Sequence, residues 1–168
     1  MKRLTEELLK NAFAGESQAH MKYLIFSEAA EREGLRNLAR LFKAIAYAEF
    51  VHARNHLKTL GSVKKSVENL DVAIAGETYE VEEMYPGYDA VAKLQEEHGA
   101  RTSYRFALEA ERIHAELYRR AREAVERGED PDIKKVWICP VCGHTYVDDE
   151  PPEKCPVCGA RKEMYVGF

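Results

Sequence analysis

Apolar residues recur at spacings of three and four along the first 130 residues, which is the period of an amphipathic helix. Glycine and proline are sparse there, and the patterned stretches end at glycines, as helices often do. The pattern predicts four long helices, with a kink at Pro86 because proline removes a helical hydrogen bond. Their expected ranges are about 5–33, 35–60, 69–98 and 100–127. Helices of about 27 residues, or about 40 Å, suit a four-helix bundle.

Two sequence motifs occur twice along these helices. AGES at 14–17 recurs as AGET at 75–78, an offset of 61, and AEFVHA at 48–53 recurs as AERIHA at 110–115, an offset of 62. Agreement of two motifs at nearly one offset indicates an internal duplication. The chain is therefore expected to contain two helical hairpins of one design.

The predicted apolar face of each helix carries a glutamate. A buried, unpaired carboxylate is unfavourable by several kcal/mol, and four of them in one core would also repel each other, so a cation set is needed. One Glu from each of two helices plus a Glu-x-x-His from each of the other two is the arrangement of ferritin-like di-metal bundles, since positions i and i+3 share a side. A single Glu-x-x-His would be ordinary surface, but two copies on inner faces favour metal. The candidate ligands are Glu16, Glu49, His52, Glu77, Glu80, Glu111 and His114.

Three of the candidate site residues rest on weaker grounds. Glu80 follows Glu77 by three residues, although this helix is acidic throughout. Tyr23 and Tyr85 follow the repeated glutamates by seven and eight residues. They either pack in the core or hydrogen-bond a ligating carboxylate, which would orient it and deliver a proton. The histidines at 20, 56, 98 and 144 are expected at the surface or in packing.

All four cysteines lie in the last thirty residues, as two CPVCG knuckles. Paired CxxC units in a reducing compartment are typical of a tetrahedral metal site, of zinc or of a single iron, which the ligand type alone does not distinguish. Five of the six prolines also follow residue 130, so a domain boundary is expected within 128–134. The expected ligands are Cys139, Cys142, Cys155 and Cys158, and the expected core of this small module is Trp137, Tyr146, Tyr165 and Phe168.

Composition and charge narrow the class of partner. The 168 residues are 32% charged and 45% hydrophobic, with a formal net charge of -4 and no cluster of Lys or Arg. This argues against nucleic acid or an anionic membrane as main partner, because both need a basic surface. No apolar run reaches the roughly 20 residues of a membrane helix, and the N-terminus lacks a signal-type run, so the cytoplasm is expected.

The motifs taken together resemble rubrerythrin over nearly the full length. The segments that carry the resemblance are AFAGESQAHMKY, AEFVHA, AGETYEVEEMYP, AERIHAELY, WICPVCG and EKCPVCGA. It implies a mainly α fold, with a ferritin-like di-iron four-helix bundle over 1–130 and a small rubredoxin-like β module over 135–168. It implies two irons at the carboxylate–histidine ligands and one iron at the cysteines, with zinc as the alternative there. His144 stands where the family commonly has an aromatic residue, which bears on the potential of that iron.

The activity that the resemblance implies is reduction of hydrogen peroxide to water. Two ferrous ions supply two electrons at once, and the four-cysteine iron returns them singly from an external, NAD(P)H-linked carrier such as reduced rubredoxin. His52 and Glu80 match the ligands that exchange at one iron with redox state, and with Tyr23 and Tyr85 they are the expected catalytic residues.

Two other function classes share part of this pattern. A ferroxidase or iron-storage bundle would use every bundle ligand but needs no one-electron relay, and a zinc-ribbon interaction module could be fused to a structural bundle. The working unit is expected to be at least a homodimer. The resemblance implies head-to-tail pairing, with the tail of one chain beside the di-iron centre of the other, and the similar hairpins could also be swapped between chains.

Overall fold

The computed structural model describes every residue from Met1 to Phe168 and divides the chain into two compact units. The first comprises Met1–Lys64 and the second Lys65–Phe168, and each is described by itself. No helix of either unit is long and apolar enough to cross a membrane.

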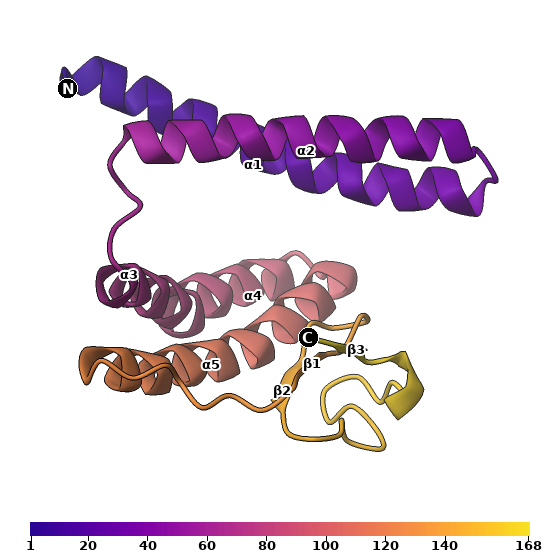
Figure 1. Ribbon diagram of the computed structural model, residues 1–168. Helices are drawn as coiled ribbons and strands as arrows, with labels where there is room; N and C mark the ends of the chain where they lie inside the picture. The colour runs from indigo at the N-terminus through magenta and orange to yellow at the C-terminus, as the bar shows by residue number, and fades with distance from the viewer. The chain divides into compact units, whose positions relative to one another are not determined.

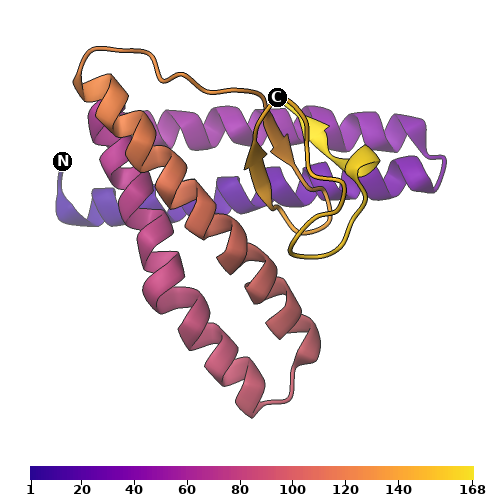
Figure 2. The same cartoon turned by 90° about the horizontal axis from the view of Figure 1, so that it is seen from below.

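The first unit is an antiparallel hairpin of α1 (Arg3–Arg32) and α2 (Arg36–Thr59), which lie side by side in both views (Figures 1 and 2). Gly34 and Gly61 follow the two helices with positive φ angles, so both predicted helices are confirmed to within about two residues. The helices approach closely because the facing residues are small. These buried residues are Ser27, Ala30, Ala39, Ala46 and Ala53.

The second unit begins with α3 (Ser66–Tyr79), a π-helical turn η1 (Glu80–Met84), α4 (Tyr85–Leu94) and α5 (His98–Glu126). The expected third helix, 69–98, was wrong at both ends. The observed helical stretch begins at Ser66. It ends at Leu94 because Glu96 adopts a positive φ of 59°, and no glycine in the sequence marks this end. Pro86 lies in the first turn of α4, directly after the π-helical turn, so the disturbance expected at the proline lies in the residues just before it.

The π-helical turn marks a one-residue difference between the two hairpins. The repeat offset is 61 before the turn and 62 after it, so η1 contains one residue more than the matching stretch of α1. Ring packing beyond the turn repeats at an offset of 62: the Tyr23–Phe42 centroid distance of 6.2 Å matches 6.1 Å for Tyr85–Tyr104. The duplication predicted from the motifs is therefore confirmed in the packing of the two hairpins.

The last part of the second unit is a three-stranded antiparallel sheet of β1 (Val136–Ile138), β2 (Thr145–Val147) and β3 (Val166–Gly167), in the order β2-β1-β3. A short 3-10 turn, η2 (Lys162–Met164), precedes β3. The mainly α fold with a small β module is thus as predicted.

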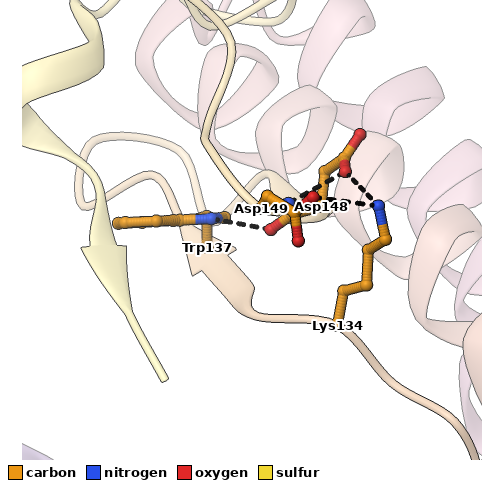
Figure 3. A network of polar contacts seen from close by, with 4 residues as sticks. All are labelled: Lys134, Trp137, Asp148 and Asp149. Carbon is orange, nitrogen blue, oxygen red and sulfur yellow. Dashed lines mark hydrogen bonds and ion pairs between the residues drawn. The ribbon is translucent and has the colours of Figure 1, made fainter.

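The core of the β module differs in two residues from the expectation, because Tyr146 is only half-buried and lies outside the core cluster, as does Phe168. Tyr165 is buried with the cysteines, and Trp137 packs against them, but the Phe168 side chain is 76% exposed. The backbone of Phe168 pairs with Val136 beside the sheet, which leaves its side chain outside the core. Figure 3 shows how the start of the module is held: Trp137 Nε1 donates to the Asp148 carbonyl at 3.1 Å, and Lys134 Nζ donates to the carboxylates of Asp148 and Asp149.

Candidate metal centres

The first candidate ligand set lies in the α1–α2 hairpin. Glu49 and His52 are three residues apart on α2, so their side chains share one side of the helix, and α1 brings Glu16 opposite them. His52 Nδ1 is 3.0 Å from Glu49 Oε2 and 3.8 Å from Glu16 Oε1. All three ligand atoms lie within 4.8 Å of one another.

The second candidate set repeats this arrangement in the other unit. Glu77 of α3 faces Glu111 and His114 of α5, and the three ligand atoms again lie within 4.8 Å of one another. His114 Nδ1 is 2.6 Å from Glu111 Oε2 and 3.8 Å from Glu77 Oε2. The structure therefore brings six of the seven predicted carboxylate and histidine ligands into two matching sets of three.

The electrostatics of both sets call for a cation. Burial, a hydrogen bond with Glu111 and the Glu111 charge raise the pKa of Glu77 to about 7. In the first hairpin, hydrogen bonds from Glu16 and then from His52 hold the pKa of Glu49 below its usual value. Each close carboxyl pair thus depends on a shared proton or on a nearby positive charge. Two carboxylates and an imidazole are donors that suit iron, so the residues fit half of a di-iron-type site in each hairpin.

Glu80 and the two tyrosines lie beside these sets. Glu80 opens the π-helical turn, and its pKa is raised by burial and then by the charge of Glu77. Burial, followed by the charges of Glu80, Glu111 and Glu77, also raises the pKa of Tyr85. Tyr23 packs against Phe42, and neither Tyr23 nor Tyr85 makes a side-chain hydrogen bond within its own unit.

Two of the remaining histidines have packing roles, as the sequence suggested. His20 Nδ1 lies 2.7 Å from the carbonyl oxygen of Ala46 across the α1–α2 hairpin. His144 is buried, and its Nδ1 lies 3.2 Å from the Tyr165 hydroxyl in an edge-to-face ring contact. Burial lowers the pKa of His144, so a neutral imidazole fills the place of an aromatic side chain.

The four cysteines form one compact cluster with their sulfurs turned inward. The Sγ atoms of Cys139 and Cys158 are 3.6 Å apart, and those of Cys142 and Cys155 are 3.5 Å apart, too far for disulfides. All four sulfurs lie within 4.8 Å of one another, as tetrahedral coordination of one metal requires.

The two knuckles have the same backbone conformation. Gly143 and Gly159 have φ angles of 78° and 77°, and each donates its N–H to the carbonyl of the knuckle's first cysteine at 2.9 Å. Burial works to raise the pKa of Cys155, but hydrogen bonds from the Tyr165 hydroxyl and from backbone N–H groups lower it to about 6. These hydrogen bonds stabilise the thiolate of Cys155, the form that binds metal, whereas burial raises the pKa of Cys142 and that of Cys158.

The β module packs against α5 of its own chain, beside the second ligand set. Phe106 of α5 packs against the cysteine cluster, and a Cβ on Gly143 would lie 4.0 Å from the Cβ of Ala110. Thr145 Oγ1 of β2 lies 2.7 Å from Nε2 of His114. The tail thus lies beside Glu111 and His114 of its own chain. The sequence offered no signal for Thr145, because the contact joins residues 31 positions apart.

Carboxylate–histidine sets on duplicated helical hairpins, with a four-thiolate module on one of them, define a class: ferritin-like di-iron-type proteins with a rubredoxin-like domain. A family model described as rubrerythrin matches residues 7–122, and one described as the rubredoxin-like domain of rubrerythrin matches residues 137–166. The chain belongs to the rubrerythrin family.

Individual relatives agree with this assignment over the whole chain. Rubrerythrin-2 of Clostridium acetobutylicum is 44% identical and is aligned over 98% of this chain and 97% of its own. Nigerythrin of Nitratidesulfovibrio vulgaris is 34% identical, over 98% of this chain and 86% of its own. A solved structure of nigerythrin, described as its fully reduced, all-ferrous state, has a TM-score of 0.56 at 32% identity, with the same coverage.

Proposed function

We propose that this protein is a non-haem di-iron peroxidase that reduces hydrogen peroxide to water and protects the cytoplasm against oxidative stress. Electrons would come from an external NAD(P)H-linked carrier, such as reduced rubredoxin, and pass through a rubredoxin-type iron at the four cysteines. One observation carries the proposal: the four-cysteine module lies against the helix that carries Glu111 and His114. A one-electron centre beside a carboxylate–histidine set is what a relay needs and what an iron store does not.

The proposed metal ligands are divided between the two hairpins. We propose that the hairpins pair through their ligand-bearing faces, within one chain or exchanged between two chains of a homodimer, to form the bundle of the 1–130 domain that precedes the 135–168 module. In support, Leu38 and Ile45, on the apolar face of α2 that also carries Glu49, are 39% and 42% exposed in the hairpin. The proposed ligands are Glu16, Glu49, His52, Glu77, Glu80, Glu111 and His114 for the di-iron site, and Cys139, Cys142, Cys155 and Cys158 for the single iron.

The roles proposed for the chain's own residues follow from their surroundings. Bound as a ferrous pair, the metals would supply the two electrons that break the O–O bond. His52 and Glu80 would alternate as a ligand, since His52 is half exposed and Glu80 lies on an irregular turn. Tyr85, whose raised pKa keeps its hydroxyl protonated, would hold a proton for the leaving oxygen, and Tyr23 would do so on the other hairpin.

Anaerobic mixing of the fully reduced protein with hydrogen peroxide tests this function, with both iron centres followed by absorbance. The expected result is oxidation of the carboxylate-bound irons, followed by oxidation of the four-cysteine iron in the same molecules. Repeated turnover with a reduced carrier should yield water and no oxygen.

The alternative, a ferroxidase or iron-storage protein, predicts another outcome. Oxygen with added ferrous iron would then be consumed faster than peroxide, and the cysteine iron would keep its oxidation state throughout. That result would contradict the peroxidase proposal.

A further inference from the structure

The two ligand sets are nearly equivalent by duplication, but one contact distinguishes them. In both hairpins, Nδ1 of the histidine faces the two carboxylates. Only in the second hairpin does Nε2 of the histidine also have a partner, because Nε2 of His114 lies within hydrogen-bond distance of Thr145 of the β module. The corresponding nitrogen of His52 makes no hydrogen bond within its unit, and the His52 side chain is 53% exposed against 29% for His114.

The contacts of Thr145 fit a His114 whose Nδ1 binds metal. Thr145 Oγ1 lies 2.7 Å from Nε2 of His114 and 3.2 Å from the carbonyl oxygen of Gly143, to which it can donate. A metal on Nδ1, which points at Glu77 and Glu111, would leave the proton of the neutral ring on Nε2. Thr145 Oγ1 would then accept from Nε2 and donate its single hydrogen to Gly143.

The Thr145 side chain is itself held firmly. It is buried, at 4% exposure, and it begins strand β2, which pairs with β1 in the register Ile138 opposite Thr145. Gly143, which receives its hydrogen, directly follows the ligand Cys142. A rigid knuckle therefore fixes the hydroxyl, and the hydroxyl fixes the imidazole.

We propose that Thr145 is the positioning residue that makes the two ligand sets unequal. It holds the His114 ring in one orientation, with Nδ1 toward the carboxylates, so that the α3–α5 set is the rigid one and His52 of the α1–α2 set is the histidine free to leave. This inference rests on the proposed role of His114 as a metal ligand and does not depend on the peroxidase reaction.

The first test uses the full chain with zinc, which is diamagnetic, at the four cysteines and at both carboxylate–histidine sets, so that NMR signals stay sharp. Slightly above neutral pH, the imidazole Nε2–H of His114 should be visible and protected from exchange with water, whereas that of His52 should not. Thr145→Val keeps the shape and removes the hydroxyl, so the His114 signal should disappear. Thr145→Ser should restore it, and Thr59→Val, which removes a hydroxyl bonded only to its own helix, should leave it unchanged.

The second test measures anaerobic binding of ferrous iron to the same proteins, prepared with the carboxylate–histidine sets free of metal. Removing the outer partner of a ligating histidine typically weakens metal binding about 10–100-fold. Thr145→Val should weaken one of the two binding steps by that factor, whereas Thr145→Ser and Thr59→Val bind as the unaltered protein does.

Three results would overturn the proposal. The first is a protected His114 Nε2–H in Thr145→Val. The second is unchanged iron binding by that variant, and the third is failure of serine to restore either property. Because no step involves peroxide, a protein inactive as a peroxidase could still pass both tests, and an active one could fail them.

Discussion

Replacing Glu77 by glutamine should change how the stability of the protein depends on pH when no metal occupies the carboxylate ligands. The pKa of Glu77 is raised from 4.5 to about 7 in the folded protein, chiefly by burial and then by Glu111. Between these two values the folded state binds more protons than the unfolded state. The free energy of unfolding therefore falls as the pH rises through this window.

The size of the effect follows from the shift and the burial. At 1.36 kcal/mol per pKa unit, the shift corresponds to a loss of up to about 3 kcal/mol between pH 4.5 and pH 7. The Glu77 side chain is 19% exposed, so solvent screening removes only part of this. Glutamine keeps the shape and the hydrogen-bonding capacity of the protonated acid but does not titrate, so Glu77→Gln should remove most of the pH dependence.

Urea unfolding followed by helical circular dichroism measures this at several pH values across the window. The protein should be treated with chelator until metal analysis shows metal only at the four cysteines. Glu116→Gln, which neutralises a largely exposed glutamate of α5, is the matched control and should follow the unaltered protein. If Glu77→Gln and Glu116→Gln show the same pH dependence, the close approach of Glu77 to Glu111 does not govern the titration.

Three further sets of substitutions test other parts of the molecule. Cys142→Ser should leave one round of oxidation by peroxide intact but abolish turnover with a reduced carrier, and steady turnover at the normal rate would exclude the relay. His52→Ala and Glu80→Ala should each leave the helical content unchanged. Each should slow peroxide turnover about 10-fold or more, because each removes one of the two ligands proposed to alternate at one metal. Full activity in both variants would rule out this ligand exchange. Ala46→Leu should destabilise the first hairpin by about 1–3 kcal/mol in thermal unfolding, because Ala46 is fully buried between α1 and α2. The control, Ala44→Leu on the exposed side of α2, should be much less destabilising.

The helices and the ligand sets were predictable because both depend on short-range periodicity. Three-residue spacing places Glu111 and His114 on one side of a helix whatever the rest of the chain does, and the repeat implies the same for Glu49 and His52. The knuckles were equally clear, because two CxxC units with a following glycine specify a local turn as well as the ligands.

The features that the sequence did not reveal depend on backbone irregularity or on long-range contacts. The spacings of seven and eight residues from the repeated glutamates to Tyr23 and Tyr85 place the extra residue between Glu77 and Tyr85, but nothing in the sequence shows that the helix absorbs it as a π-helical turn. The end of α4 depends on Glu96 adopting a left-handed conformation that glycine usually takes. Phe168 looks like a core residue by type, but its backbone pairs with Val136 beside the sheet while its side chain stays exposed.

Under the proposed redox function, a duplicated hairpin would create a problem that these irregularities address. Two identical ligand sets would bind their two metals in the same way. Neither metal would then change its ligand while the other kept its own. In this chain the second hairpin carries Glu80 at the start of the turn that contains the inserted residue, while its histidine is tied to the β module through Thr145. The first hairpin has an alanine, Ala19, at the position three residues after its own glutamate, and its His52 has no such tie. The added carboxylate and the untied histidine thus belong to different hairpins. Pairing of the hairpins would let Glu80 take the place of His52 at one metal, while His114 stays fixed at the other.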